Sequence, residues 1–92
     1  MAKFLMLGKY SREAIKGISS ERTKNAVSLI EKAGGKVSSM YALLGNYDLA
    51  LVVDFPGVPE VMKTSIALMD LTGISFTTSC AIPIEEFDRI AR

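Results

Sequence analysis

The sequence predicts a single α+β domain over residues 1–92, in which a four-stranded antiparallel sheet has two helices on one face. Three observations predict this class. Four apolar, β-branched runs have the length of strands, and two segments with helical spacing separate the first run from the second and the third from the fourth. A Gly45-Asn46 pair joins the middle two runs. With short connections and right-handed crossovers, this order is that of a ferredoxin-like sandwich.

The first 36 residues contain one strand, a short turn and one helix. Residues 3–10 form an apolar run, after which Ser11 can cap a brief turn that Gly17 ends. A helix then begins at Ser19 or Ser20 and ends at Gly34-Gly35, where a positive φ is needed. Its apolar side recurs at helical spacing through Ala26, Val27, Ile30 and Ala33.

The remaining residues contain three strands and two helices. Residues 37–44 and 47–55 predict two strands, and Pro59 suits the first turn of a helix that Gly73 ends. The apolar stripe of this helix is expected to be Val61, Met62, Ser65, Ile66 and Met69. Residues 74–82 predict the last strand, which Pro83 stops, and residues 84–91 a short terminal helix with Phe87 and Ile90 on one side.

The Gly45-Asn46 pair predicts a two-residue type II′ turn, and this turn fixes the strand register. Tyr41 then faces Ala50, and Leu43 faces Asp48. Because cross-strand partners share a face, the hairpin separates into two sets. The set expected beneath the helices is Met40, Ala42, Leu44, Tyr47, Leu49, Leu51 and Val53. The set on the opposite face is Val37, Ser39, Tyr41, Leu43, Asp48, Ala50, Val52 and Asp54.

The opposite face is apolar in its middle and acidic at its ends, which is unusual for a surface facing water. Large apolar patches generally bind a partner, so a second copy of the chain is expected to cover this face about a two-fold axis. The predicted interface residues are Val37, Ser39, Tyr41, Leu43, Ala50 and Val52. The alternative is that the terminal helix folds across the same face.

Composition excludes several classes of protein. Without histidine the chain cannot form a metal site based on imidazole or use a histidine base, so we expect no metal and no cofactor. Its one cysteine, Cys80, cannot form an internal disulfide and is expected to be a small buried residue, and the expected location is the cytoplasm. No apolar run approaches the ~20 residues of a membrane span, and no signal peptide is expected, because the apolar core of residues 1–8 is too short and lacks a small-residue cleavage site.

Five residues are candidates for contact with a ligand: Lys9, Tyr41, Asp48, Asp54 and Thr77. Each also has a structural interpretation. Asp48 can accept backbone N–H bonds at the turn, or pair with Lys9 or with a basic residue of another subunit, and Asp54 can help cap the following helix. Tyr41 can simply pack in the interface, Lys9 can be an exposed surface lysine, and the high β propensity of threonine can explain Thr77. The two aspartates lie six residues apart on one strand, about 20 Å, so they cannot form one paired site in a protomer.

The segment Tyr41-Ala42-Leu43-Leu44-Gly45-Asn46-Tyr47-Asp48 resembles the GYD domain family, whose name derives from the Gly and Tyr-Asp present here as Gly45 and Tyr47-Asp48. The resemblance extends to residues 4–10, 34–37 and Thr77-Thr78, while Asp54 and residues 57–59 depart from it. It implies a dimeric α+β barrel and brings no assigned reaction. Residues 45–49 and 71–78 are more distantly similar to the effector-binding domain of leucine-responsive regulators, which implies amino-acid binding at subunit contacts.

These observations together predict a homo-oligomeric small-molecule-binding module, with the ligand between paired sheets. The alternative is a cofactor-free isomerase or monooxygenase using Asp48, Tyr41 or Lys9 as acid or base. A purely structural assembly subunit is the third possibility. Nucleic acid is not expected as a partner, because the open face carries Asp48 and Asp54 and only one stacking aromatic, Tyr41.

Overall fold

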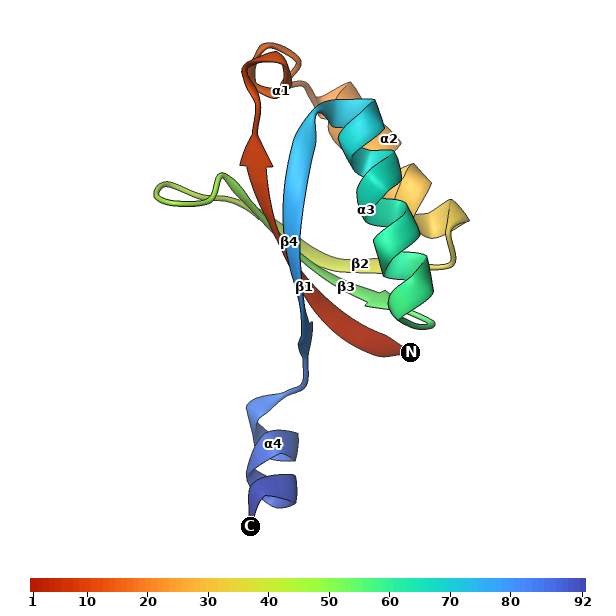
Figure 1. Ribbon diagram of the computed structural model, residues 1–92, viewed down its shortest axis with the longest axis vertical. Coiled ribbons are helices and arrows are strands. Elements are labelled where there is room, and N and C mark those ends of the chain that lie inside the picture. Colours follow the sequence, from red (N-terminus) through yellow and green to blue (C-terminus); the bar gives the residue numbers. More distant parts are fainter.

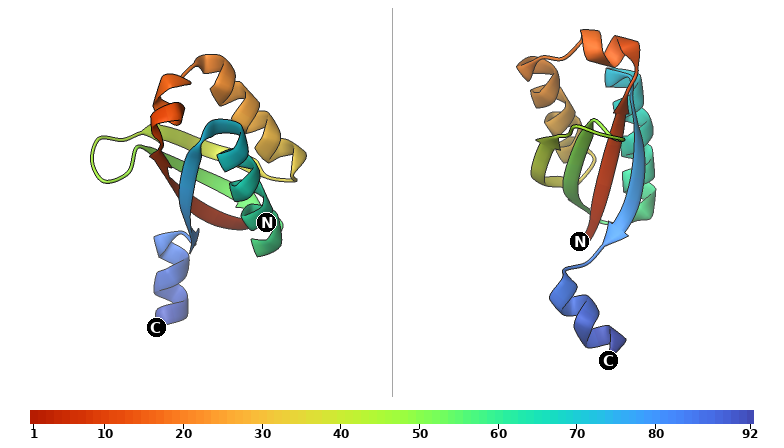
Figure 2. Two further views of the ribbon diagram at one scale, coloured as in Figure 1. Left: turned by 45° about the horizontal axis from the view of Figure 1, so that its top comes forward. Right: turned by 90° about the vertical axis from the view of Figure 1, so that its left-hand side faces the viewer.

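A computed structural model describes all 92 residues. The element order is β1 (Ala2–Tyr10), α1 (Arg12–Lys16), α2 (Ser20–Lys32), β2 (Lys36–Ala42), β3 (Leu49–Phe55), α3 (Val58–Thr72), β4 (Ile74–Ala81) and α4 (Ile84–Ala91). The four strands form one antiparallel sheet in the order β2-β3-β1-β4. Helices α2 and α3 lie side by side on one face of this sheet (Figures 1 and 2). The α+β ferredoxin-like prediction is therefore confirmed.

The helix ends follow the local signals in the sequence. Ser11 caps α1 by accepting a hydrogen bond from the Ala14 N–H, and Ser19 caps α2 by accepting one from the Arg22 N–H, both at 3.0 Å. Gly73 ends α3 with φ at 76°, in the left-handed region that glycine adopts most readily. The predicted boundaries of these helices depend on such short-range contacts, and the structure contains these contacts.

The core lies between the sheet and the two long helices. It contains Phe4 and Met6 from β1, three residues of β3, and side chains from α2 and α3. Because side chains alternate along a strand, Leu5 and Leu7 of β1 face away from the helices. The eight residues of the core cluster are Phe4, Met6, Ile30, Leu51, Val53, Phe55, Val61 and Leu68.

The predicted register of the β2–β3 hairpin is confirmed near the turn and fails farther away. Met40 pairs with Leu51, Tyr41 with Ala50 and Ala42 with Leu49. A bulge at Ser38 then shifts the pairing by one residue, so Val37 pairs with Val53 and packs against the core. The prediction that Val37 shares the open face with Tyr41 is therefore wrong, because one inserted residue moves every earlier side chain to the other face.

The connection between β2 and β3 is a six-residue loop, Leu43 to Asp48, and the predicted two-residue turn is wrong. Ladder pairing ends with the bond from the Leu43 N–H to the Asp48 carbonyl, at 2.9 Å. Leu44 is consequently fully exposed and Tyr47 half-buried, although both were expected beneath the helices. Gly45 adopts φ of 140°, a conformation that favours glycine.

Two expectations about apolar residues in the second half are also wrong. The buried stripe of α3 is Val61, Thr64, Leu68 and Thr72, while Met62, Ile66 and Met69 are exposed. Apolar residues occupy two neighbouring faces of this helix, and packing against the sheet selects one of them. Cys80 is exposed, because β4 is an edge strand and no element covers its outer end.

Helix α4 extends away from the rest of the molecule (Figure 1), and all of its residues are exposed. The alternative in which it covers the open sheet face of its own chain is therefore contradicted. No helix combines the length and apolar character that crossing a bilayer requires.

Candidate functional site

The sheet face opposite α2 and α3 carries an ordered grid of side chains, which we call the open face. Its centre consists of two cross-strand rows. In one, Tyr41, Ala50, Leu7 and Thr77 follow one another across β2, β3, β1 and β4. In the next, the order is Ser39, Val52, Leu5 and Ser79. The two middle strands thus contribute four apolar side chains, and the outer strands contribute mainly hydroxyls.

The central apolar side chains are only half-buried by their neighbours. Leu5, Leu7, Ala50 and Val52 all have intermediate exposure, and no helix covers them. Of the predicted interface residues, Ser39, Tyr41, Ala50 and Val52 lie on the strands of this face. Leu43 lies at the beginning of the loop, just beyond β2. The open face is therefore apolar in the middle and bordered by polar groups, as its alternating pattern predicts.

Tyr41 and Thr77 lie on opposite edges of one row, separated by the two inner strands. Three strand spacings of ~4.8 Å put their backbones about 14 Å apart. Tyr41 is 60% exposed, so its ring and hydroxyl stand free above β2. Neither side chain meets the other directly, but a molecule that spans the row would meet both.

Asp48 and Lys9 together hold the Leu43–Asp48 loop against β1. One carboxylate oxygen of Asp48 accepts a hydrogen bond from the Tyr10 N–H, and the backbone N–H of Asp48 donates one to the Gly8 carbonyl, both at 2.9 Å. The Lys9 ammonium donates to the Asn46 carbonyl at 2.7 Å. These bonds confirm the turn-anchoring interpretation of Asp48.

Asp54 lies at the other end of β3, in a separate polar cluster. Its carboxylate accepts hydrogen bonds from the Lys3 ammonium at 3.2 Å and from the Ser38 hydroxyl at 3.1 Å. The bond from Lys3 favours the ionised form and lowers the pKa of Asp54 below its ordinary value of 3.8. The expectation that Asp54 caps α3 is wrong: Gly57 is the N-cap and has no side-chain bond, while Asp54 is engaged by Lys3 and Ser38.

The five predicted ligand residues are therefore distributed along the edges and ends of the open face. Asp48 and Lys9 lie at one end, Asp54 at the other, and Tyr41 and Thr77 at the two sides. Within one protomer they frame an apolar surface without converging on a point. No group of three or more Cys, Asp or Glu side chains is placed to hold a metal ion.

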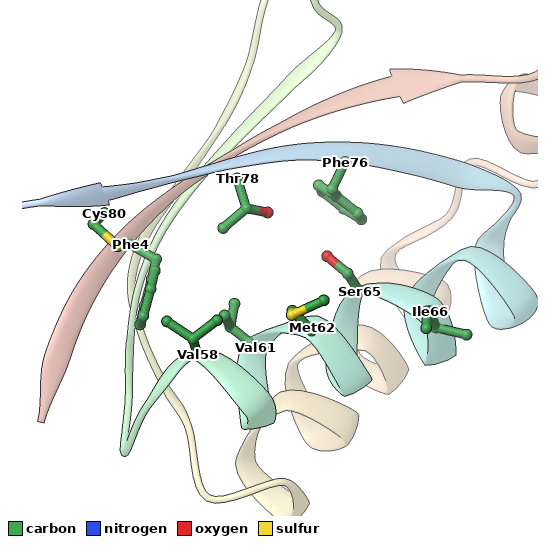
Figure 3. Close-up of a pocket in the computed structure, with 9 residues that line it drawn as sticks. All are labelled: Phe4, Val58, Val61, Met62, Ser65, Ile66, Phe76, Thr78 and Cys80. Carbon is green, nitrogen blue, oxygen red and sulfur yellow. The ribbon is translucent and has the colours of Figure 1, made fainter.

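A second feature, which the sequence reasoning missed, is an apolar groove between α3 and the edge strand β4 (Figure 3). Its cavity volume is about 370 Å³. Val58, Met62 and Ile66 form its α3 side, and Phe76, Thr78 and Cys80 project from β4 (Figure 3). The Thr78 hydroxyl is buried here without a hydrogen-bond partner. The sequence feature that could have predicted this groove is the second apolar stripe on α3, because packing against the core requires only one.

Comparisons with known proteins agree with this fold. The crystal structure of the Mycobacterium tuberculosis leucine response regulatory protein LrpA superimposes with a TM-score of 0.59 at 8% sequence identity, over 89% of this chain and 51% of that one. This chain thus corresponds to about half the length of that regulator, and the likeness shows a common fold. A comparison with curated proteins finds no matching sequence. The profile of the GYD domain matches residues 4–91, nearly the whole chain, and the protein accordingly belongs to the GYD domain family.

Proposed function

We propose that this protein is a small-molecule-binding module in which two copies pack their open faces together and hold a ligand between them. The observation that carries the proposal is the uncovered apolar centre of the sheet, formed by Leu5, Leu7, Ala50 and Val52. Both long helices lie on the other face, and α4 points away, so the chain itself leaves these side chains in water. A second open face is the surface that matches this one in area and polarity.

The polar border supports an amphipathic ligand. In a face-to-face pair, the apolar centres would enclose a hydrocarbon body, while hydroxyls and charged groups of both copies would border it. The Asp54–Lys3 cluster and the Lys9 ammonium supply both signs of charge, and Tyr41 and Thr77 supply hydroxyls. An α-amino acid with an apolar side chain has this chemistry. The name of the structurally similar leucine response regulatory protein supports testing amino acids first.

Binding is a better match to the geometry than acid–base catalysis. The enzyme alternative depends on Asp48 or Lys9 as a base or acid, and both groups are engaged in holding the loop. Tyr41 remains free on the open face, but no titratable side chain is hydrogen-bonded to its hydroxyl. The structure thus offers surfaces and polar borders for a ligand, whereas the three groups on which the enzyme alternative depends are not hydrogen-bonded to one another.

Pairing of the open faces is tested by Leu7→Lys, with Ile15→Lys as the matched control. Burying one leucine contributes about 1.5–3 kcal/mol, and a two-fold dimer buries Leu7 twice. We therefore expect the dimer dissociation constant of Leu7→Lys to rise about 10²- to 10⁴-fold in sedimentation velocity. Ile15 is 58% exposed on α1, outside the open face, so Ile15→Lys should sediment like the wild type. A wild-type chain that stays monomeric at 100 μM would contradict the proposal.

Ligand binding is tested by thermal denaturation of the wild-type protein with each of the twenty amino acids, at pH 6, 7 and 8. A ligand at 100 times its dissociation constant should stabilise the folded protein by about 2.7 kcal/mol. Tyr41→Phe and Thr77→Val remove one hydroxyl each with little change in shape, and both should weaken the effect of an active compound. If the protein is dimeric and no amino acid raises the midpoint temperature, the choice of ligand class is wrong although the pairing stands.

A further inference from the structure

Helix α4 and the α3–β4 groove are two apolar surfaces of the same chain that lack a partner. The three apolar side chains of α4 remain largely in solvent, with exposed fractions of 62% for Ile84, 51% for Phe87 and 71% for Ile90. They occupy one side of the helix, and the acidic and basic residues occupy the other. A helix with this pattern is stable only where its apolar side finds a surface to cover.

The groove matches the apolar side of such a helix in length and in number of apolar side chains. Its α3 side carries three exposed apolar residues, Val58, Met62 and Ile66, spaced by four positions. At 1.5 Å per residue, Val58 to Ile66 spans about 12 Å, and Ile84 to Ile90 spans about 9 Å. Each side thus presents three large apolar groups over a similar length, in the manner of an amphipathic helix in a groove.

The short connection between β4 and α4 directs α4 away from the groove of its own chain. Only Ile82 and Pro83 separate the two elements, and Pro83 is extended, with φ of −58° and ψ of 145°. Ile82 precedes proline and is itself restricted to extended backbone. A reversal at this point would use Pro83 and Ile84 as the two central residues of a turn, which would take Ile84 out of the first turn of α4 and away from its apolar side.

We infer that α4 of one protomer docks in the α3–β4 groove of a second copy of this chain, and that the exchange is reciprocal. Each tail has about 300 Å² of apolar side-chain surface to bury. A reciprocal exchange, counting tails and grooves, would bury about 1,200 Å², which is within the range of stable protein interfaces. This contact is separate from the proposed pairing of open faces, because the groove lies at the sheet edge on the helix side.

The native Cys80 allows the contact to be tested by disulfide cross-linking, because it lines the groove and is the only cysteine. The acceptor is the otherwise unchanged full-length chain. Each donor is a Cys80→Ala chain that carries Ile84→Cys, Phe87→Cys or Ile90→Cys. A tag gives the donors a different length from the acceptor, so that the two can be told apart on a gel. The control donor is Cys80→Ala with Glu86→Cys, which places the cysteine on the polar side of α4. After mixing and oxidation, we expect at least one of the three donors to form a disulfide with the acceptor at least tenfold faster than this control.

A second acceptor separates the groove from the open face. Ser79 and Cys80 are neighbours on β4 whose side chains point to opposite faces of the sheet. An acceptor with Cys80→Ala and Ser79→Cys should therefore react at least tenfold more slowly with the same donors. Faster reaction at position 79 would put α4 on the open face and overturn the inference. Equal rates for all donors would overturn it as well.

A single-chain control tests whether the tail reaches its own groove. In Phe87→Cys with Cys80 retained, docking between copies predicts a disulfide-linked dimer on a non-reducing gel. A monomeric disulfide between residues 80 and 87 would show docking within one chain and would refute exchange. The altered α4 side chains are all exposed, so these substitutions leave the core intact. The outcome is also independent of Leu7→Lys, which reports on the open face alone.

Discussion

Replacing Gly35 by alanine tests how tightly the connection between α2 and β2 packs on the core. A Cβ atom at this position would lie 2.6 and 2.7 Å from two ring atoms of Phe55, and 3.0 Å from a methyl group of Ile30. Favourable contacts between carbon atoms occur at about 3.5–4.0 Å, so the overlap is close to 1 Å. Phe55 and Ile30 are both fully buried, and neither can move without displacing other core residues.

We expect Gly35→Ala to lower the free energy of unfolding by about 2 kcal/mol, within the usual range for an overpacked core. For a domain of this size, this corresponds to a fall in midpoint temperature of about 8–16 °C. The matched control is Gly17→Ala, where φ is −94° and the tightest contact of a Cβ is a terminal guanidinium nitrogen of Arg22, at 3.0 Å, rather than a buried core side chain. Its free energy of unfolding should change by less than about 0.5 kcal/mol.

Both variants should be compared with the wild type by urea denaturation and calorimetry at one protein concentration, because association would make the midpoint concentration-dependent. The decisive quantity is the difference between the two variants. If Gly35→Ala is as stable as Gly17→Ala, the Phe55 ring does not occupy the space beside Gly35, and the connection between α2 and β2 does not pack closely on the core.

Two further substitutions test local contacts. Ser19→Ala removes the acceptor for the Arg22 N–H and should lower the free energy of unfolding by about 1 kcal/mol, measured by urea denaturation, whereas Ser20→Ala, one residue inside the helix, should have little effect. Asp54→Asn tests the Lys3 pair through its pH dependence. Because the pKa of Asp54 is lowered on folding, its stabilisation is fully present above the ordinary value of 3.8 and is lost as pH falls through the lowered pKa. The stability difference between the wild type and Asp54→Asn should therefore be larger at pH 6 than at pH 3, and a constant difference would show that the pair does not act through this ionisation.

Much of the fold could be predicted because its signals are local. A serine acceptor within three residues of a free backbone N–H fixes the beginning of a helix, as at Ser11 and Ser19. A glycine that tolerates positive φ fixes the end, as at Gly34 and Gly73. The hairpin register near Tyr41 and Ala50 follows from the alternation of apolar residues and the position of Gly45-Asn46.

The errors occur where contacts between distant segments decide the outcome. The Ser38 bulge, which moves Val37 into the core, coincides with a hydrogen bond from Ser38 to Asp54, sixteen residues away. The loop between β2 and β3 is wider than a tight turn because β1 binds it through Gly8 and Lys9. Neither contact leaves a periodic trace in the sequence of β2 or of the loop.

The sequence by itself determined the order of the elements, the ends of the helices, the class of fold and the presence of an apolar sheet face without a helix, because these depend on spacing and capping along the chain. Tertiary structure decided which of two apolar sides of α3 is buried, that Cys80 is exposed, and that α4 leaves its own domain. Those outcomes depend on how much surface the sheet offers to each helix. Since a four-stranded sheet with a free edge at β4 accommodates only one side of α3, the other side borders a groove that the chain does not fill itself.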